Sequence, residues 1–265
     1  MRALFLLLPL ALAATTAEAA PLRDLCSQRP GLGTPACTVD PGHLQIEAAL
    51  GDWTLDRQPD TRTDTIVSGD VQARYGLTDT LEARIGWTAF GHERIRDRAS
   101  GTVSRESGIG DVTVGMKRNL ANPDGSGFSA ALLPFASLPV GRSPAGAGDW
   151  GAGLLVPLTY QISDAFQIEF TPEIDAAVDQ DRHGRHLAYS GVIGIAETFG
   201  QTLMASLEYQ RLRDNDPSGR VTTQLAGVSM AWHPQERVQF DVGSNIGLDH
   251  ASPDVQIYFG VTRKF

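Results

Sequence analysis

The chain ends on the stretch Asp254-Val255-Gln256-Ile257-Tyr258-Phe259-Gly260-Val261-Thr262-Arg263-Lys264-Phe265. Apolar side chains at every second position alternate with polar or small ones, which indicates a β-strand with two unlike faces. Outer-membrane β-barrels commonly end on such a strand and on an aromatic residue, because their assembly machinery recognises it. Arg263 departs from the pattern on the outward face, where a long cation can reach the lipid headgroups. We therefore expect a barrel-assembly signal formed by Ile257, Phe259, Val261 and Phe265.

The composition agrees with an exported β protein. The chain has 265 residues, a formal net charge of −9 and a hydrophobic fraction of 42%. A helical membrane protein would be more apolar, whereas an outer-membrane barrel has an average composition because half of each strand is polar. No basic patch occurs along the chain, which argues against nucleic acid as a partner.

Residues 1–19 have the features of an export signal. A positive charge at Arg2 precedes an apolar run over residues 3–14, and small residues at 17–19 supply a cleavage site. The apolar run is too short for a helix that spans a bilayer. We expect this signal peptide to be absent from the mature protein.

Residues 20–42 are expected to form a short periplasmic segment ahead of a barrel at 43–265. Cys26 and Cys37 are the only cysteines and both lie in this segment. Export to an oxidising compartment favours a disulfide between them. Free thiols are one alternative, and a metal site is another, although a pair of neighbouring histidines is missing.

From His43 onward, alternating segments predict about twelve strands of roughly ten residues, the length that suits a tilted transmembrane β-strand. Short turns alternate with long polar connections, which lie at 52–64, 91–107, 141–149, 179–186, 212–220 and 249–253. Short periplasmic turns and long outer loops are typical of outer-membrane barrels. We therefore expect an all-β fold, a closed antiparallel transmembrane β-barrel. Pro134, Pro157 and Pro172 would mark bulges or strand ends, because a closed barrel has no edges.

One face of the predicted strands is charged. If Leu77-Thr78-Asp79 is a three-residue turn, Arg74 lies opposite Glu82. These side chains either form ion pairs that fill a narrow barrel or line a mildly acidic conduit, and the sequence leaves both interpretations open. The proposed lumen-facing residues are Asp70, Arg74, Glu82, Arg84, Asp111, Lys117, Glu169, Glu173, Asp175 and Asp241.

Several phrases resemble a proteobacterial outer-membrane transporter family that is labelled after a MetA (meta-cleavage) pathway of phenol degradation. The most specific ones open the mature chain, and others follow in its middle and at its terminal Phe. They are Arg-Pro-Gly at 29–31, Thr-Pro-Ala-Cys-Thr-Val at 34–39, Pro-Gly-His-Leu-Gln-Ile-Glu at 41–47, Tyr-Gly-Leu-Thr-Asp at 75–79 and Gly-Ile-Gly-Asp-Val-Thr-Val-Gly-Met-Lys at 108–117. The resemblance implies a porin-like barrel with a transport role and no catalytic residues.

The histidines give little support to an enzyme. Some twelve-stranded barrels hydrolyse lipids, but no His-Ser pair here has a spacing that argues for nucleophilic catalysis. His183 and His186 share a stretch with Asp179 and Asp181 that could bind a metal and is more simply a solvated loop. We therefore expect no catalytic residues, no metal ligands and no cofactor.

These patterns together predict a porin-like channel for passive passage of small polar or aromatic solutes across the bacterial outer membrane. Its partners would be outer-membrane lipid, the barrel-assembly machinery and a small-molecule solute. The alternative is a structural or adhesive barrel without transport. Because acidic residues outnumber basic ones on the inner face, an open lumen should favour cations or neutral solutes.

Overall fold

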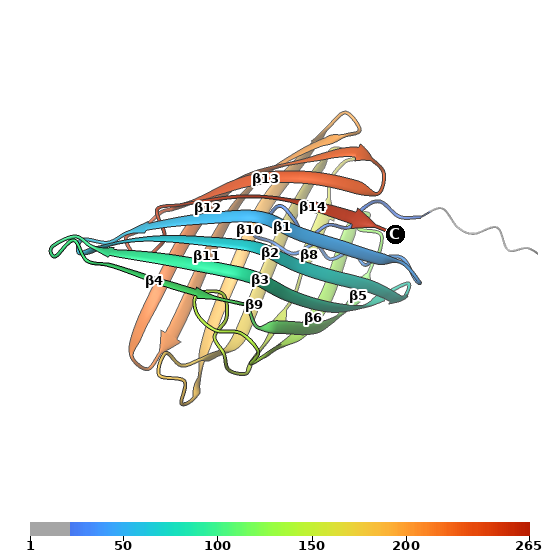
Figure 1. The fold of residues 1–265 in the computed structure, drawn as a ribbon. Helices are drawn as coiled ribbons and strands as arrows, with labels where there is room; N and C mark the ends of the chain where they lie inside the picture. Colours follow the sequence, from blue (N-terminus) through green and yellow to red (C-terminus); the bar gives the residue numbers. More distant parts are fainter. Residues whose placement is uncertain (1–21) are drawn as a thin grey trace, which may run out of the picture.

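The computed structural model describes residues 22–265, so the signal peptide expected at 1–19 lies outside the described residues. Within 22–265, no helix is long and apolar enough to cross a bilayer. The described chain is built from strands (Figure 1). They are β1 (Leu44–Arg57), β2 (Thr61–Thr78), β3 (Leu81–Asp97), β4 (Val103–Gly108), β5 (Val112–Ala121), β6 (Phe128–Leu138), β7 (Gly151–Leu155), β8 (Leu158–Gln161), β9 (Phe166–Val178), β10 (Arg185–Phe199), β11 (Leu203–Asp216), β12 (Gly219–Gln235), β13 (Val238–Gly247) and β14 (Val255–Lys264).

The strands close into one antiparallel barrel. The last strand, β14, pairs with β1, with Ala48 opposite Val261. Two wall positions are each shared by two shorter strands. β4 and β5 both pair with β3, and β7 and β8 both pair with β6 and β9. The fourteen strands therefore fill twelve wall positions, which confirms the predicted fold class. Pro157 lies at the interruption between β7 and β8, where a residue without an N–H costs no ladder bond.

Burial in this barrel is the reverse of burial in a water-soluble protein. The largest fully buried side chains are polar, led by Arg74, Lys117 and Gln45. Large apolar side chains point outward, such as Ile193, which is 58% exposed, and Phe259, which is 51% exposed. An apolar exterior around a polar interior is the arrangement of a barrel that is solvated by lipid.

The terminal strand follows the same rule. Ile257, Phe259 and Phe265 are exposed on the outer face, while the alternate side chains of Tyr258, Thr262 and Lys264 are buried. Arg263 also faces outward, and its guanidinium lies 4.8 Å from the centre of the Phe265 ring. This cation–π contact near the end of the chain gives the one outward charge of the strand an aromatic partner.

Several strands are much longer than the sequence pattern predicts. β2 has 18 residues and β3 has 17, and β1 and β2 are joined by residues 58–60 alone. At about 3.3 Å per residue, β2 is about 59 Å long, roughly twice the hydrocarbon thickness of a bilayer. The connections expected at 52–64, 91–107 and 212–220 are thus largely strand, because polar residues pair in a ladder as readily as apolar ones.

The turn between β2 and β3 also differs from the prediction. A bulge between Gly76 and Thr78 places Arg74 opposite Arg84, and Glu82 opposite Gly76. Arg74 and Glu82 are therefore diagonal rather than directly opposed. Their side chains still meet, since long side chains bridge diagonal neighbours on one face of a sheet.

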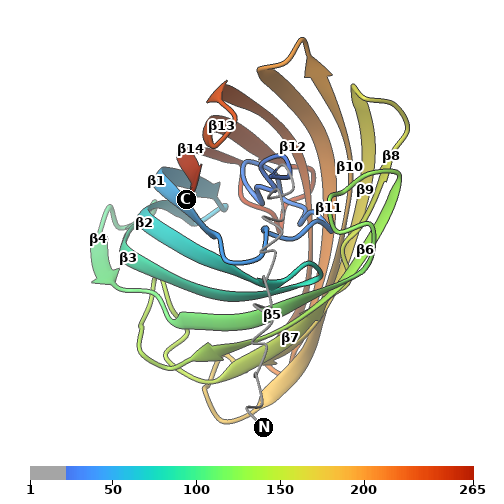
Figure 2. The same cartoon turned by 90° about the vertical axis from the view of Figure 1, so that its right-hand side faces the viewer.

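The N-terminal segment lies inside the barrel. Figure 2 shows residues 22–43 within the ring of strands, at the end that holds the C-terminus. The segment expected at 20–42, ahead of the barrel, thus lies among the strands over its described residues. The physical reason is hydrogen bonding. The backbone N–H and C=O groups of the segment find partners among the charged side chains of the inner wall, and without them these backbone groups would stay unpaired.

Candidate functional site

A cluster of buried charges on β1, β2, β3 and β5 forms the centre of the inner wall. The Arg74 guanidinium lies 2.8 Å from Glu47 Oε1 and 2.9 Å from Glu82 Oε1. The Lys117 ammonium and the Arg84 guanidinium approach the same Glu82 oxygen at 3.5 and 3.6 Å. Alternation on adjacent strands brings all five side chains to one face, and each charge has an opposite neighbour.

This cluster also binds the backbone of the N-terminal segment. Glu47 Oε2 accepts hydrogen bonds from the N–H groups of Gln28 and Arg29, at 2.9 and 3.1 Å. Glu82 Oε2 accepts one from Val39 N–H at 3.0 Å. Lys117 donates to the carbonyl oxygens of residues 35 and 37, at 3.0 and 2.6 Å, and Arg74 donates to the carbonyl of residue 26. The charged side chains of the wall therefore supply the hydrogen bonds that a neighbouring strand would otherwise supply to this irregular segment.

The opposite wall holds the segment in the same way. Glu208 on β11 accepts hydrogen bonds from Leu32 N–H at 2.9 Å and Gly33 N–H at 2.8 Å. A Cβ added at Gly33 would lie 2.7 Å from Glu169 Oε1, so a larger residue here would displace the Glu169 carboxylate. Asp241 on β13 forms an ion pair with Arg29 at 2.8 Å. The segment thus crosses the lumen from β2 and β3 to β11.

Three further charges meet at the rim of the barrel where the first described residues of the segment lie. The Lys264 ammonium lies 3.0 Å from Asp40 Oδ2 and donates to the carbonyl of Arg23 at 2.5 Å. Arg23 also donates to the carbonyl of Asp79 at 2.9 Å, in the turn between β2 and β3. The end of the chain, its first described residues and a short turn are therefore joined at one rim of the barrel.

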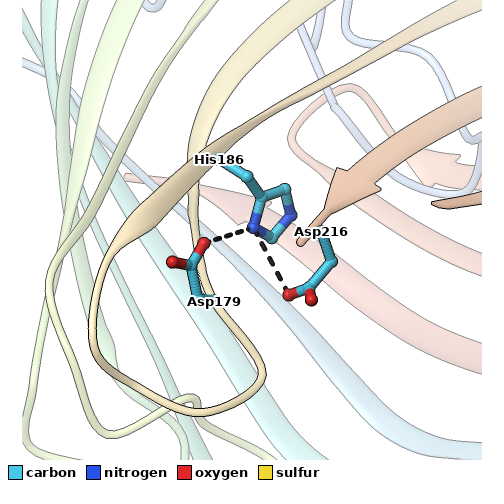
Figure 3. Close-up of side chains that lie close together, drawn as sticks. All are labelled: Asp179, His186 and Asp216. Atoms are coloured by element: carbon cyan, nitrogen blue, oxygen red, sulfur yellow. Dashed lines mark hydrogen bonds and ion pairs between the residues drawn. The ribbon is translucent and has the colours of Figure 1, made fainter. Parts of the chain in front are cut away.

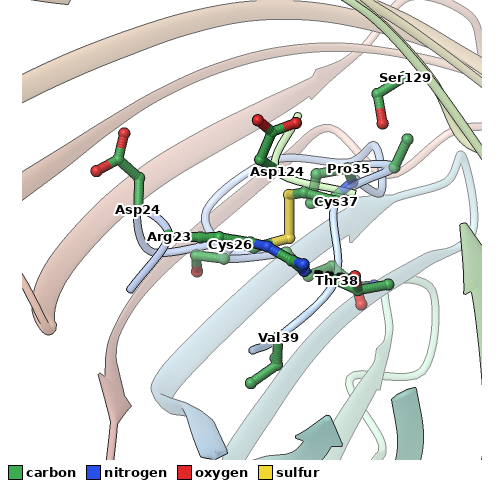
Figure 4. Close-up of a disulfide and its surroundings, with 12 residues drawn as sticks. Arg23, Asp24, Cys26, Pro35, Cys37, Thr38, Val39, Asp124 and Ser129 are labelled. Atoms are coloured by element: carbon green, nitrogen blue, oxygen red, sulfur yellow. Dashed lines mark hydrogen bonds between the residues drawn. A yellow bond between two sulfur atoms is a disulfide. The ribbon is translucent and has the colours of Figure 1, made fainter. Parts of the chain in front are cut away.

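A disulfide closes the segment on itself. Cys26 and Cys37 are joined with an S–S distance of 2.06 Å (Figure 4). The residues between them contain the turn that reaches Glu208, and Cys26 is buried. Together with the wall contacts, the bridge makes residues 22–43 a compact plug, and we use that name for it below.

Two cavities lie between the plug and the wall. The first, of about 340 Å³, is lined on one side by residues 28–31 of the plug and on the other by Asp70, Thr88 and Asp111. The second, of about 230 Å³, is lined by Arg84, Phe135 and Glu173 among others. Both cavities share Gln28, Gln72, Gly86 and Thr113, so they meet at one polar constriction beside the plug.

The ten residues that the sequence assigns to the lumen separate into three groups in the structure. Arg74, Glu82, Arg84 and Lys117 form the buried cluster, whereas Asp241 and Glu169 lie against the plug. The others lie at or near the cavities: Asp70, Asp111, Glu173 and the half-buried Asp175. Asp111 has a second role, because its carboxylate accepts hydrogen bonds from the N–H groups of Gly141 and Gly148 at 2.8 and 3.0 Å.

Sequence reasoning missed three of the most engaged side chains. Glu47 lies on the polar parity of β1, and Glu208 lies on the polar parity of β11, so strict alternation could have found both. Lys264 precedes the terminal Phe265 and faces inward for the same reason. Alternation could not predict the binding partner of these three side chains, because all three bind the plug, which has no alternating pattern of its own.

Two histidine contacts appear away from the lumen. The His92 ring lies 2.8 Å from Ser107 Oγ, where β3 pairs with β4, a pair that the sequence spacing did not suggest. Among residues 22–265, no carboxylate bonds to the His92 ring. His186 lies with Asp179 and Asp216 in a separate cluster at the loop end of the barrel (Figure 3).

Comparison with known proteins identifies the fold. Residues 27–265 match the model of a protein family described as “Putative MetA-pathway of phenol degradation”. No match is found among curated protein sequences. An outer membrane channel of known structure from Pseudomonas putida F1 has 12% sequence identity and a TM-score of 0.72, over 89% of this chain and 100% of that one.

Two further solved structures share the architecture at lower similarity. The KdgM porin has 10% identity and a TM-score of 0.50, over 83% of this chain and 99% of that one. The transport unit of the autotransporter AIDA-I from Escherichia coli has 7% identity and a TM-score of 0.52, over 83% and 89%. The shared fold is that of an outer-membrane β-barrel.

Proposed function

Because the chain belongs to the family described by the MetA pathway of phenol degradation, we propose that it is an outer-membrane channel with a narrow, plug-lined path. The observation that carries the proposal is the pair of cavities that meet between residues 28–34 and the wall formed by β2, β3 and β5. Small polar or aromatic solutes would pass there by diffusion. The termini and short turns would face the periplasm, as in other barrels with long outer loops.

The charges along this path favour cations and neutral solutes. Four acidic side chains line the two cavities, against two arginines. Arg29 is already paired with Asp241, and Arg84 lies beside Glu82. Of the four acids, Glu47 alone has an ion-pair partner among the described residues, Arg74. The free charge facing a solute is therefore negative, and rings of carboxylates select for cations.

A structural barrel without transport is the second candidate, and the plug is the observation that favours it. Contacts on both walls, together with the disulfide, fix the plug at both ends and in its middle. If these contacts persist and the constriction at Gln28 and Gln72 stays closed, the barrel carries no current. The proposal includes no catalytic step.

Planar-bilayer recording on the purified full-length mature protein separates the two candidates. We expect small, cation-selective currents, seen as a reversal potential of the corresponding sign under a salt gradient. Replacing one acid in each cavity, by Asp70→Lys and Glu173→Lys, should shift the reversal potential toward anions. Asp181→Lys makes one such acid-to-lysine change in an exposed outer loop and should leave selectivity unaltered.

The outcomes are distinct. Absence of current from protein that is shown to be folded would favour the structural barrel. Anion selectivity in the native protein would contradict the path assigned here, even if transport occurs. Equal shifts in the cavity variant and in Asp181→Lys would show that the measured selectivity arises outside the lumen.

A further inference from the structure

The loop end of the barrel carries a cluster that does not belong to the lumen. His186, the second residue of β10, lies 2.8 Å from Asp179 Oδ1 and 3.5 Å from Asp216 Oδ2, both measured from Nδ1. Asp179 follows β9 directly, and Asp216 ends β11. Figure 3 shows both carboxylates turned toward the same ring nitrogen.

The cluster is more enclosed than an outer loop would suggest. The His186 side chain is 6% exposed, and those of Asp179 and Asp216 are 13% and 12% exposed. His186 Nε2 is buried and lies 2.7 Å from Asp214 Oδ1, yet off the direction of a hydrogen bond. A buried imidazole with three carboxylates around it therefore has one nitrogen without a hydrogen-bond partner.

The Asp216 carboxylate is held by second contacts. Asp216 Oδ2 accepts a hydrogen bond from Gln180 N–H at 2.7 Å, and Asp216 Oδ1 accepts one from Ser218 N–H at 2.7 Å. The Ser218 hydroxyl in turn donates to the Gln180 side chain at 2.7 Å. Contacts of this kind orient a carboxylate that binds a metal ion, and they raise the affinity of the site for the ion.

The spacing suits one metal ion. Around a first-row divalent ion with bonds of about 2.1 Å, neighbouring ligand atoms lie about 3.0 Å apart in octahedral and about 3.4 Å apart in tetrahedral geometry. The two distances from Nδ1 bracket these values, and all three ligand atoms lie within 4.8 Å of one another. Imidazole with carboxylates suits Zn²⁺ and related ions, whereas Ca²⁺ and Mg²⁺ prefer oxygen alone.

We propose that Asp179, His186 Nδ1 and Asp216 bind a divalent transition-metal ion, with Zn²⁺ as the representative, at the loop end of the barrel. Asp214 is a positioning residue, because its carboxylate lies 2.7 Å from Nε2, favours the imidazole proton on that nitrogen and leaves Nδ1 unprotonated for the ion. Water completes the coordination. The ion links the loop at 179–184 to the β11–β12 hairpin.

Isothermal titration of the folded full-length mature protein with ZnCl₂ tests the site. We expect one saturable Zn²⁺ per chain that an excess of Ca²⁺ does not displace. His186→Ala, Asp179→Asn and Asp216→Asn should each weaken binding at least about tenfold, and Asp214→Asn should weaken it less. His183→Ala is the matched control, because this histidine is 85% exposed in the same loop and should leave binding unaltered.

Heat-dependent migration on gels verifies that each variant is folded before titration. On the unaltered protein, X-ray absorption with one equivalent of Zn²⁺ should show oxygen and nitrogen neighbours at about 2.0–2.1 Å, with a single imidazole. Two imidazoles, no saturable binding, or an equal loss in His183→Ala and His186→Ala would each overturn the proposal.

Discussion

At the scale of single residues, the barrel interior depends on charges that have lost their water. Arg74 is fully buried and contacts Glu47 and Glu82, which are buried as well. Each carboxylate also accepts backbone N–H groups of the plug, so the desolvation of these charges is compensated by several partners at once. Removal of one charged side chain therefore leaves a buried charge without an opposite partner, which costs more than the loss of one favourable contact.

Arg74→Met should therefore destabilise the barrel strongly. Breaking a buried pair by removing one partner costs about 3–5 kcal/mol, because the remaining charge stays buried. Urea unfolding of protein refolded into lipid vesicles measures the change as a lower midpoint with an unchanged slope. Arg62→Met is the control, since Arg62 pairs with Asp64 at the exposed end of β2. The unfolding midpoint of this variant should match that of the native protein. Equal midpoints for the two variants would contradict the central role of the cluster.

Residue alternation predicts the direction in which a side chain points but not its partner. Arg74 and Glu82 were correctly placed on one face, although the pairing register differs from the predicted one by two positions, with Arg84 rather than Glu82 opposite Arg74. The contact of Glu208 with the plug joins residues 175 positions apart, and no local pattern encodes it. His186 was assigned to a solvated loop for the same reason, because Asp216 comes from a different hairpin.

At the scale of elements, the plug is the segment that sequence reasoning described least well. It has no period of two and no repeat, so it gives no signal of burial, yet Ala36 and Val39 are almost fully buried. It binds the charged side chains of the wall largely through its own backbone groups, and hydrogen bonding by a backbone depends little on which residues carry it. The strands, in contrast, were predictable because each needs one apolar and one polar face.

Loss of the disulfide should loosen the plug without unfolding the barrel. Closing a loop of this size contributes about 3 kcal/mol in chain-entropy models, and Cys26→Ser with Cys37→Ser removes that contribution. We expect a larger single-channel conductance than in the native protein, and the largest conductance when residues 22–42 are deleted. The β signal in circular dichroism should be unchanged, because the strands supply their own ladder bonds. A conductance equal to that of native protein in both variants would show that the plug does not limit the path.

At the scale of the whole molecule, the two ends of the barrel are unlike. One end holds short turns, the plug entrance and Lys264 beside the C-terminus. The other holds the long outer parts of β1, β2 and β3, which Figure 1 shows reaching away from the C-terminus. We therefore expect one orientation in the membrane, with the long extensions outside.

Cysteine labelling on intact cells tests this orientation. Ala99→Cys, in the turn between β3 and β4, and His183→Cys, in the loop after β9, should react with an impermeant maleimide. Gln201→Cys, in the short turn between β10 and β11, should react only after the outer membrane is opened. Equal reactivity at all three positions would refute the orientation, and the reverse pattern would invert it.

The inverted burial of this barrel has a consequence for how such chains diverge. Lipid accepts any apolar side chain of any shape, so outward positions can exchange among Leu, Ile, Val and Phe at little cost in packing. A soluble core resists such exchange, because its side chains must interlock. The channel from Pseudomonas putida F1 keeps this wall at 12% identity, a level that this freedom makes understandable. Evolutionary kinship in such barrels is therefore best sought in the inward polar groups, where a substitution has to satisfy a fixed partner.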